Sequence, residues 1–384
     1  MKILFASDIS FSRMEEQANT DTLHTIASSV KPVFDSADFR MVNQECIFYD
    51  GDAAPIIKSG PNIKCGKGFI EFLKFLNVDA AALANNHTGD FGPEAVTECI
   101  KYIKSNGIAT LGAGANLEEA YKAHVFEKDG MKVSVIAVCE NEFGSADDNK
   151  AGSAGYNLGL LSEKMKEEKA KSDFTVIYFH GGNEKNPFPS PMKVDLYRHF
   201  IDFGADAVIA MHTHCPQGYE YYNGKPIVYS MGNFYFPRSD MPDDDTWRFG
   251  YLSMLDFSKD GVKLEIFPYR TYGQLNNLEL LEGEKKEKFM AYLDQITRPI
   301  GDRAKIKHLF KIWAAVSGSN YSKAVNFAEE MTDDAEKTRR VKNIFGCEAH
   351  NELIREFLFM SYNGEIAKYL PLWDEVNKYR KITL

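Results

Sequence analysis

Short apolar runs alternate with amphipathic segments up to about residue 270, and this alternation limits the possible folds more than any other feature of the chain. The runs predict strands at Ile3–Ala6, Phe39–Val42, Ala80–Ala84, Val133–Val138, Thr175–Phe179, Ala207–Met211 and Ile227–Tyr229. The amphipathic segments predict helices at Gly68–Leu76, Pro93–Ser105 and Met192–Phe203. Strands that alternate with helices favour an α/β core that is covered on both faces. Residues 248–268 instead predict an antiparallel hairpin that turns at "KDG".

The pattern changes beyond about residue 275, where apolar residues recur at helical spacing. They are Ile306, Leu309, Phe310, Trp313 and Val316 in one segment and Leu353, Ile354, Phe357 and Met360 in another. We therefore expect one domain over residues 1–272 and a helical C-terminal region over 273–384. The apolar faces of these helices must be covered by the core or by a second copy of the chain. A homodimer through this region is one expectation.

Charge and hydropathy exclude several classes of partner. The 45 basic and 55 acidic residues give a net charge of -10, and no block of Lys or Arg offers a surface for nucleic acid or anionic membrane. No apolar stretch approaches the roughly 20 residues that span a bilayer. The N-terminus reaches Asp8 too early for the core of a signal peptide. We therefore expect a cytoplasmic protein without a membrane anchor.

Five of the predicted strands end on side chains that can bind a metal ion. These side chains are Asp8, Asn43, Glu45, Asn86, His87, His180, His212 and His214. The ligand crevice of an open α/β sheet lies at the carboxyl ends of its strands. One such residue would be an ordinary polar strand end, but the whole set favours a metal site. Nitrogen and oxygen ligands without cysteine suit Mn, Fe or Zn rather than Ca or Mg. The remaining histidines, including His350, lack this context and receive no role.

One glycine-rich stretch favours structure over chemistry. "GAGANL" at 112–117 has leucine where a dinucleotide-binding loop needs its third glycine. It predicts a strand-to-helix turn with Asn116 as the N-cap.

Several blocks of the sequence, in order, resemble the calcineurin-like metallophosphoesterase superfamily, and more closely its bacterial capsule-synthesis branch of CapA-type proteins associated with poly-γ-glutamate. The blocks are "SDISFSR" (7–13), "NQE" (43–45), "ANNHTGDFG" (84–92), "GAGANLEEA" (112–120), "HGGNE" (180–184), "GADAVIAMHTH" (204–214) and "GKPIVYSMGNF" (224–234). The resemblance covers about residues 1–270. It implies an α/β (α+β) fold, a metallophosphoesterase-like two-sheet sandwich flanked by helices, with a helical C-terminal addition.

The resemblance also implies a set of site residues around one or two divalent ions. The implied metal ligands are Asp8, Glu45, Asn86, His180, His212 and His214. Glu45 would bridge two metal positions, of which Asn86, His180 and His212 complete one and Asp8 and His214 the other. The superfamily's Asp-x-His block reads Asp8-Ile9-Ser10 here, so the second position lacks one histidine.

The implied catalytic residues are His87, as proton donor to the leaving oxygen, and Asp90, which would orient the imidazole. Asn85 and Glu184 are candidates for contacts with the ligands or the substrate. Arg13 and Lys58 are candidate basic contacts for an anionic substrate, although the loop around Lys58 also fits a purely solvated role.

The function implied is metal-dependent hydrolysis, with a phosphoester as the substrate class that the fold favours. The substrate would be a small or polymeric anion. Two alternatives stay open. One is a polymer (poly-γ-glutamate) assembly factor that retains the metal site with little or no turnover. The other is hydrolysis of an amide or peptide-like bond.

Overall fold

The first of two large sheets has eight strands, in the order β18-β17-β16-β1-β2-β5-β6 with β15 beside β1. The computed structural model describes residues 1–384 except 15–18, 274 and 326–334. Within this sheet β1, β2, β5, β6 and β15 run parallel, whereas β16, β17 and β18 are antiparallel. The strands are β1 Lys2–Ile9, β2 Phe39–Gln44, β5 Ala80–Ala82, β6 Ala109–Leu111, β15 Asn233–Tyr235, β16 Phe249–Ser258, β17 Gly261–Tyr272 and β18 Asn277–Leu280.

The second large sheet has six strands, in the order β13-β14-β12-β11-β9-β8. Its four central strands are parallel, and its two edge strands are antiparallel. The strands are β8 His124–Lys128, β9 Met131–Cys139, β11 Phe174–His180, β12 Ala207–Met211, β13 Tyr219–Tyr222 and β14 Lys225–Val228. Two small sheets pair β3 (Ile47–Phe48) with β4 (Lys64–Cys65), and β7 (Ala113–Gly114) with β10 (Gly152–Ser153).

The alternation of side chains along β1 explains how the two sheets pack. Ile3 and Phe5 belong to the core shared with the second sheet, whereas Leu4 and Ala6 face a separate core under the first helices. Successive strand residues point to opposite faces, so one strand supplies both cores. The Tyr178 hydroxyl of β11 donates a hydrogen bond of 2.6 Å to the Ala6 carbonyl across the interface. The predicted two-sheet sandwich is confirmed.

Helices flank the sandwich. They are α1 Thr20–Ala27, α2 Lys31–Asp35, α3 Ile70–Phe75, α4 Gly92–Ser105, α5 Leu117–Ala120, α6 Leu158–Lys169 and α7 Pro191–Asp202. Buried residues of α1 to α4 share the outer core of the first sheet. Asn116 accepts a hydrogen bond from the Glu119 amide and caps α5, as predicted. The predicted hairpin is formed by β16 and β17, whose turn lies between Ser258 and Gly261.

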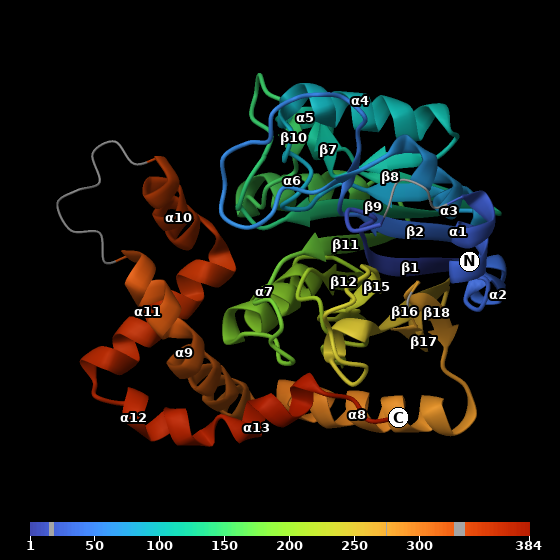
Figure 1. Ribbon diagram of the computed structural model, residues 1–384. Coiled ribbons are helices and arrows are strands. Elements are labelled where there is room, and N and C mark those ends of the chain that lie inside the picture. The colour runs from blue at the N-terminus through green and yellow to red at the C-terminus, as the bar shows by residue number, and fades with distance from the viewer. Residues whose placement is uncertain (15–18, 274, 326–334) are drawn as a thin grey trace.

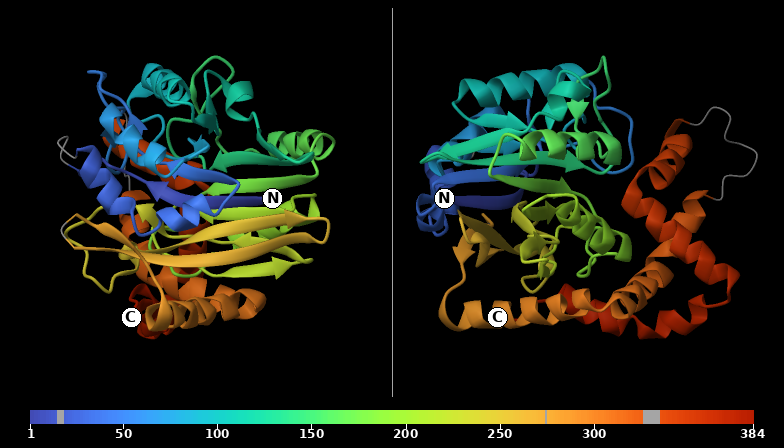
Figure 2. Two further views of the ribbon diagram at one scale, coloured as in Figure 1. Left: turned by 90° about the vertical axis from the view of Figure 1, so that its right-hand side faces the viewer. Right: turned by 180° about the vertical axis from the view of Figure 1, so that it is seen from behind.

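Among the residues that the structure describes, the C-terminal region is mainly helical from Gly283 onward. Its helices are α8 Gly283–Thr297, α9 Arg303–Val325, α10 Ala335–Gly346, α11 Glu348–Tyr362, α12 Ile366–Tyr369 and α13 Asp374–Asn377. Helix α8 runs along one side of the sheets, and α9 leads from it to α10 and α11 (Figures 1 and 2). Strand β18 lies within this region of the sequence, beyond the predicted boundary at 272, yet it pairs with β17 in the first sheet.

Two surface properties of the helices bear on the expected partners. Phe345, Leu358, Phe359 and Tyr362 of α10 and α11 are exposed, and a homodimer through this region stays a prediction. Among the residues that the structure describes, no helix combines the length and the apolar character needed to cross a membrane.

A buried carboxyl group joins α11 to the core. Glu352 accepts hydrogen bonds from the Ser190 hydroxyl and from the Met192 amide, 2.9 Å away, at the start of α7. Burial raises the pKa of Glu352 to about 7, although these hydrogen bonds oppose the rise.

We predict that Glu352 makes the protein less stable as pH rises. An unfolded glutamate loses its proton near pH 4.3, whereas folded Glu352 keeps it to about pH 7. The contribution is therefore complete below pH 4.3 and is lost as pH rises through 7, a change of about 4 kcal/mol. Glu352→Gln, which stays neutral, should flatten the dependence of the unfolding free energy on pH between 5 and 8, measured by urea titration. An unchanged slope would contradict the assignment.

Candidate metal centre

The six predicted metal ligands meet at one edge of the sandwich, where parallel strands of both sheets end. Asp8 lies near the end of β1, and Glu45 directly follows β2. Asn86 lies in the loop after β5, and His180 is the last residue of β11. His212 and His214 follow β12, with φ angles of 99° and 55°. Such positive φ values are uncommon outside glycine and mark a constrained turn.

Three ligand atoms form a first group. His180 Nε2 lies 3.1 Å from Asn86 Oδ1 and 2.9 Å from His212 Nδ1. Ligands bound to one ion at about 2.1 Å lie roughly 3 Å apart, so the spacing suits a shared cation. The second nitrogen of His180, Nδ1, lies 3.4 Å from Asp8 Oδ1. A carboxylate on the far nitrogen orients a metal-binding imidazole.

Asp8, Glu45 and His214 form a second group, with one ligand atom from each lying within 4.8 Å of the others. His214 Nδ1 lies 2.8 Å from Asn233 Oδ1, and the Asn233 amide is oriented by donating to the Trp247 carbonyl. The hydrogen on His214 therefore sits on Nδ1, and Nε2 is left as a ligand, 3.9 Å from Glu45 Oε1.

Burial and charge show that a divalent cation fits this group. Both carboxylate oxygens of Glu45 are buried without a hydrogen-bond partner. Burial raises the pKa of Glu45 well above its usual value, and the charges of Asp8 and Glu184 add to the rise. A buried carboxylate is costly unless a positive charge or hydrogen bonds compensate it, so these residues suit a cation. Glu45 as a bridge to the first group stays a prediction.

The remaining ligands are arranged as oxygen and neutral nitrogen donors. Burial raises the pKa of Asp8, but its hydrogen bond to His180 and nearby imidazoles outweigh this and leave it lowered. Burial and the neighbouring His180 hold the pKa of His212 well below its usual value. A neutral imidazole and an ionised carboxylate are the forms that bind metal.

His87 lies beside the second group without a comparable set of ligand contacts. Its Nδ1 is 2.8 Å from Asp90 Oδ2, and its Nε2 is 3.9 Å from Glu45 Oε1. Lys58 Nζ lies 2.5 Å from Asp90 Oδ1 and 3.0 Å from His87 Nδ1. Burial lowers the pKa of His87, and Lys58 adds to this against the effect of Asp90. Asp90 and Lys58 thus fix the ring so that Nε2 faces Glu45.

The other candidate substrate contacts differ in position. Asn85 is fully buried and donates hydrogen bonds to Asn43 Oδ1 and to the Gln44 carbonyl, so it fastens the loop to β2. Glu184 is exposed, and its charge acts on Glu45. The half-exposed Arg13 pairs with Asp240 at 3.7 Å.

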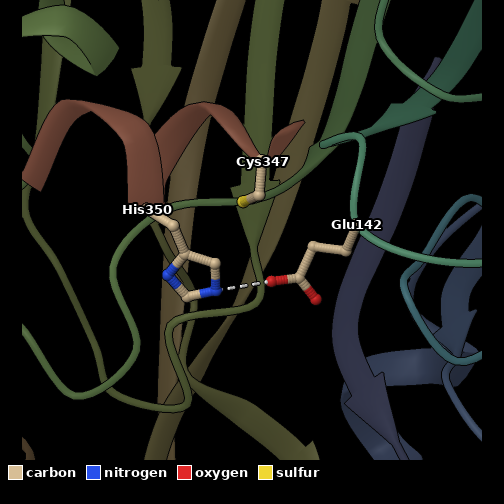
Figure 3. A group of neighbouring side chains, drawn as sticks. All are labelled: Glu142, Cys347 and His350. Atoms are coloured by element: carbon tan, nitrogen blue, oxygen red, sulfur yellow. Dashed lines mark ion pairs between the residues drawn. The ribbon is translucent and has the colours of Figure 1, made fainter. Parts of the chain in front are cut away.

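Four residues outside the implied ligand set surround the site. Asn43 Nδ2 donates to Asp8 Oδ1 at 2.8 Å, and Asn233 orients His214. Glu142 Oε2 accepts from Asn86 Nδ2 at 2.7 Å, and Glu142 Oε1 pairs with His350 Nε2 at 3.0 Å (Figure 3). Because Glu142 accepts the amide hydrogen, Asn86 must turn its oxygen toward His180. The sequence does not predict that His350 lies near the site, because its partner Glu142 is more than 200 residues away along the chain.

The fold and the converging side chains describe an α/β protein with a candidate metal centre, and its family follows from sequence comparison. Residues 2–238 match the family described as bacterial capsule synthesis protein PGA_cap, so the chain belongs to that family. Among curated relatives it is 26% identical over 237 residues to the PGA biosynthesis protein CapA of Bacillus subtilis, covering 60% of this chain and 62% of that protein. It is 29% identical over 160 residues to the capsule biosynthesis protein CapA of Bacillus anthracis, covering 40% of this chain and 39% of that protein. The chain therefore spans less than two thirds of these relatives.

Solved structures with a similar arrangement share little sequence. A putative 5'-nucleotidase from Staphylococcus aureus is 14% identical, with a TM-score of 0.44 over 77% of this chain and 58% of that chain. A phosphatase from Mycoplasma pneumoniae is 15% identical, with a TM-score of 0.43 over 70% of this chain and 92% of that chain.

We predict unequal metal retention in the two groups. Ser10 hydrogen-bonds Ser12 at 2.8 Å, and a hydroxyl is a weaker ligand than an imidazole for Mn, Fe or Zn. Dialysed protein should keep about one equivalent by metal analysis, and His180→Ala should lose it. The exposed His199→Ala on α7 is the matched control. Two tightly held equivalents, or loss in both variants, would contradict this.

A second prediction concerns Glu142. Glu142→Ala should free the Asn86 amide to rotate and weaken metal binding by roughly 10- to 100-fold, as other changes behind a ligand do. Calorimetric titration of metal into the metal-free variant measures this. Unchanged affinity would show that Asn86 is oriented by other contacts.

Proposed function

We propose that the chain is a divalent-metal-dependent hydrolase that acts on a phosphoester of an anionic substrate. The observation that carries this proposal is the placement of His87 Nε2, 3.9 Å from Glu45 Oε1 and held from behind by Asp90 at 2.8 Å. A ring fixed on one nitrogen and free on the other, beside a group suited to a cation, is the arrangement that proton transfer to a leaving group requires.

The residues of the chain divide this chemistry among themselves. A bound divalent cation would lower the pKa of water and polarise a phosphoryl oxygen. Asp90 accepts the Nδ1 hydrogen of His87 and keeps the ring aimed at Glu45. Lys58 shares that carboxylate, and its charge favours a proton leaving His87. Glu45 and Asp8 supply negative charge for the cation, and Asn86, His180 and His212 supply neutral donors.

A second candidate function is an assembly factor for a capsule polymer that keeps the metal site with little or no turnover. The names of the relatives favour it, because they describe PGA and capsule biosynthesis proteins rather than phosphatases. A screen of metal-loaded protein against phosphomonoesters, phosphodiesters and γ-glutamyl amides separates the candidates. Ester turnover supports the proposal, amide turnover points to an amidase, and no turnover favours the assembly factor.

The role of His87 gives the sharpest mutational test. His87→Ala should lower turnover of the best ester by roughly 10²- to 10⁴-fold, because the leaving oxygen loses its proton donor. The variant should keep the same metal content as the His199→Ala control. Metal loss as large as in His180→Ala would show that His87 is a ligand instead.

A further inference from the structure

A cavity of about 210 Å³ lies between the C-terminal helices and the loop that joins β3 to β4. Its polar lining residues are Ser59 from that loop, Asn320 and Tyr321 from α9, Arg340 and Asn343 from α10, and His350 from α11. In Figures 1 and 2 the blue loop extends from the sheets toward α10 and α11. Apart from Ser59, every one of these residues lies outside the family match at 2–238.

Two sets of contacts place this cavity next to the metal centre. His350 pairs with Glu142 at 3.0 Å (Figure 3). Glu142 also accepts a hydrogen bond from the side chain of the proposed ligand Asn86 at 2.7 Å. On the other wall, Ser59 directly follows Lys58, whose Nζ is 3.0 Å from His87 Nδ1. One wall of the cavity is therefore formed by Ser59, the residue after Lys58, which contacts His87. The other wall includes His350, which is connected to Asn86 through Glu142.

The lining suits a negative charge, although the chain as a whole carries a net charge of -10. Among the residues that the structure describes, no acidic side chain lines the cavity, whereas Arg340 is basic and His350 is a basic residue that pairs with Glu142. Arg340 has no ion-pair partner among the residues that the structure describes. A guanidinium without a described ion-pair partner, in a cavity whose polar lining otherwise consists of Ser, Asn and Tyr side chains and the paired His350, suits a carboxylate or phosphate, which it binds in a two-pronged geometry.

Unpartnered polar atoms provide an independent sign of a ligand. Asn343 is 8% exposed, and its side-chain oxygen has no hydrogen-bond partner. The Ser59 hydroxyl is also buried without a partner. The Tyr321 hydroxyl lies 2.7 Å from His350 Nδ1 and fixes that ring. Buried polar atoms are normally paired. The Ser59 hydroxyl can donate to an anion, whereas the Asn343 oxygen accepts only and needs a hydroxyl or amide hydrogen on the same ligand.

We propose that this cavity binds a second anionic group of the substrate, a carboxylate or a phosphate, while the bond to be cleaved lies at the metal centre. Arg340 is the main contact, and the C-terminal helices thereby set specificity for substrates with two anionic groups. The word substrate rests on the proposed hydrolase function, but anion binding by the cavity does not.

Calorimetric titration of the full-length, metal-loaded protein tests the binding step. The probes are glutarate, its neutral analogue glutaramide, and inorganic phosphate. Arg340→Met should weaken binding of at least one anion tenfold or more, Arg340→Lys should restore part of it, and glutaramide should be unaffected by either change. Arg339→Met, the neighbouring residue outside the cavity lining, is the matched control. The anion that loses affinity identifies the group that the cavity prefers. Equal losses in the Arg339 and Arg340 variants, or no loss in either, would overturn the proposal.

A kinetic comparison separates this inference from the hydrolase proposal. The ratio of kcat/KM for 4-carboxyphenyl phosphate to that for phenyl phosphate should fall at least fivefold in Arg340→Met and stay constant in Arg339→Met. Turnover with an unchanged kcat/KM ratio in Arg340→Met would refute the cavity proposal but not the hydrolase proposal. Absence of turnover for every ester, with anion binding that still depends on Arg340, would refute the hydrolase and support the cavity.

Discussion

The buried carboxylate of Glu45 is the constraint on which the arrangement of the site depends. Both of its oxygens are buried without a hydrogen-bond partner, with Asp8 and His214 close by. Leaving an ionised carboxylate in this position costs several kcal/mol unless a cation compensates it. Asp8 lies on β1 of the first sheet, whereas His214 follows β12 of the second sheet. A cation at this point would therefore join the carboxyl edges of both sheets.

Much of the core could be predicted because local patterns and tertiary structure agree there. Each apolar run, such as the one ending at Asp8, forms a strand, because a continuous run of apolar residues is buried best in a sheet that is covered on both faces. The rule that polar residues at strand ends converge also applies to Glu142, which follows β9 after two intervening residues. Pairing at a distance is different: nothing near His350 in the sequence indicates Glu142 as its partner. Strand β18 was missed because a four-residue edge strand has too few residues for a period to be read.

The C-terminal helices are fastened to the wall of the site by polar contacts from α11. Glu348 accepts hydrogen bonds from the Asn141 amide and side chain, and His350 pairs with Glu142. Asn141 and Glu142 belong to the segment after β9, which also reaches Asn86. Two contacts, His350 to Glu142 and Glu142 to Asn86, therefore connect α11 to a proposed metal ligand. This gives a physical reason for a helical addition to influence chemistry at the edge of the sheets.

The central claim, that a cation compensates the buried charge of Glu45, is tested most directly by thermal unfolding of wild type and Glu45→Gln with and without Mn, Fe or Zn. Removing an unpaired buried charge should raise the Tm of the metal-free variant above that of metal-free wild type. Added metal should raise the Tm of wild type by more than that of Glu45→Gln, which retains only the first group of ligands. A metal-free variant that is less stable than wild type, together with an equal metal-dependent rise in both proteins, would contradict the account.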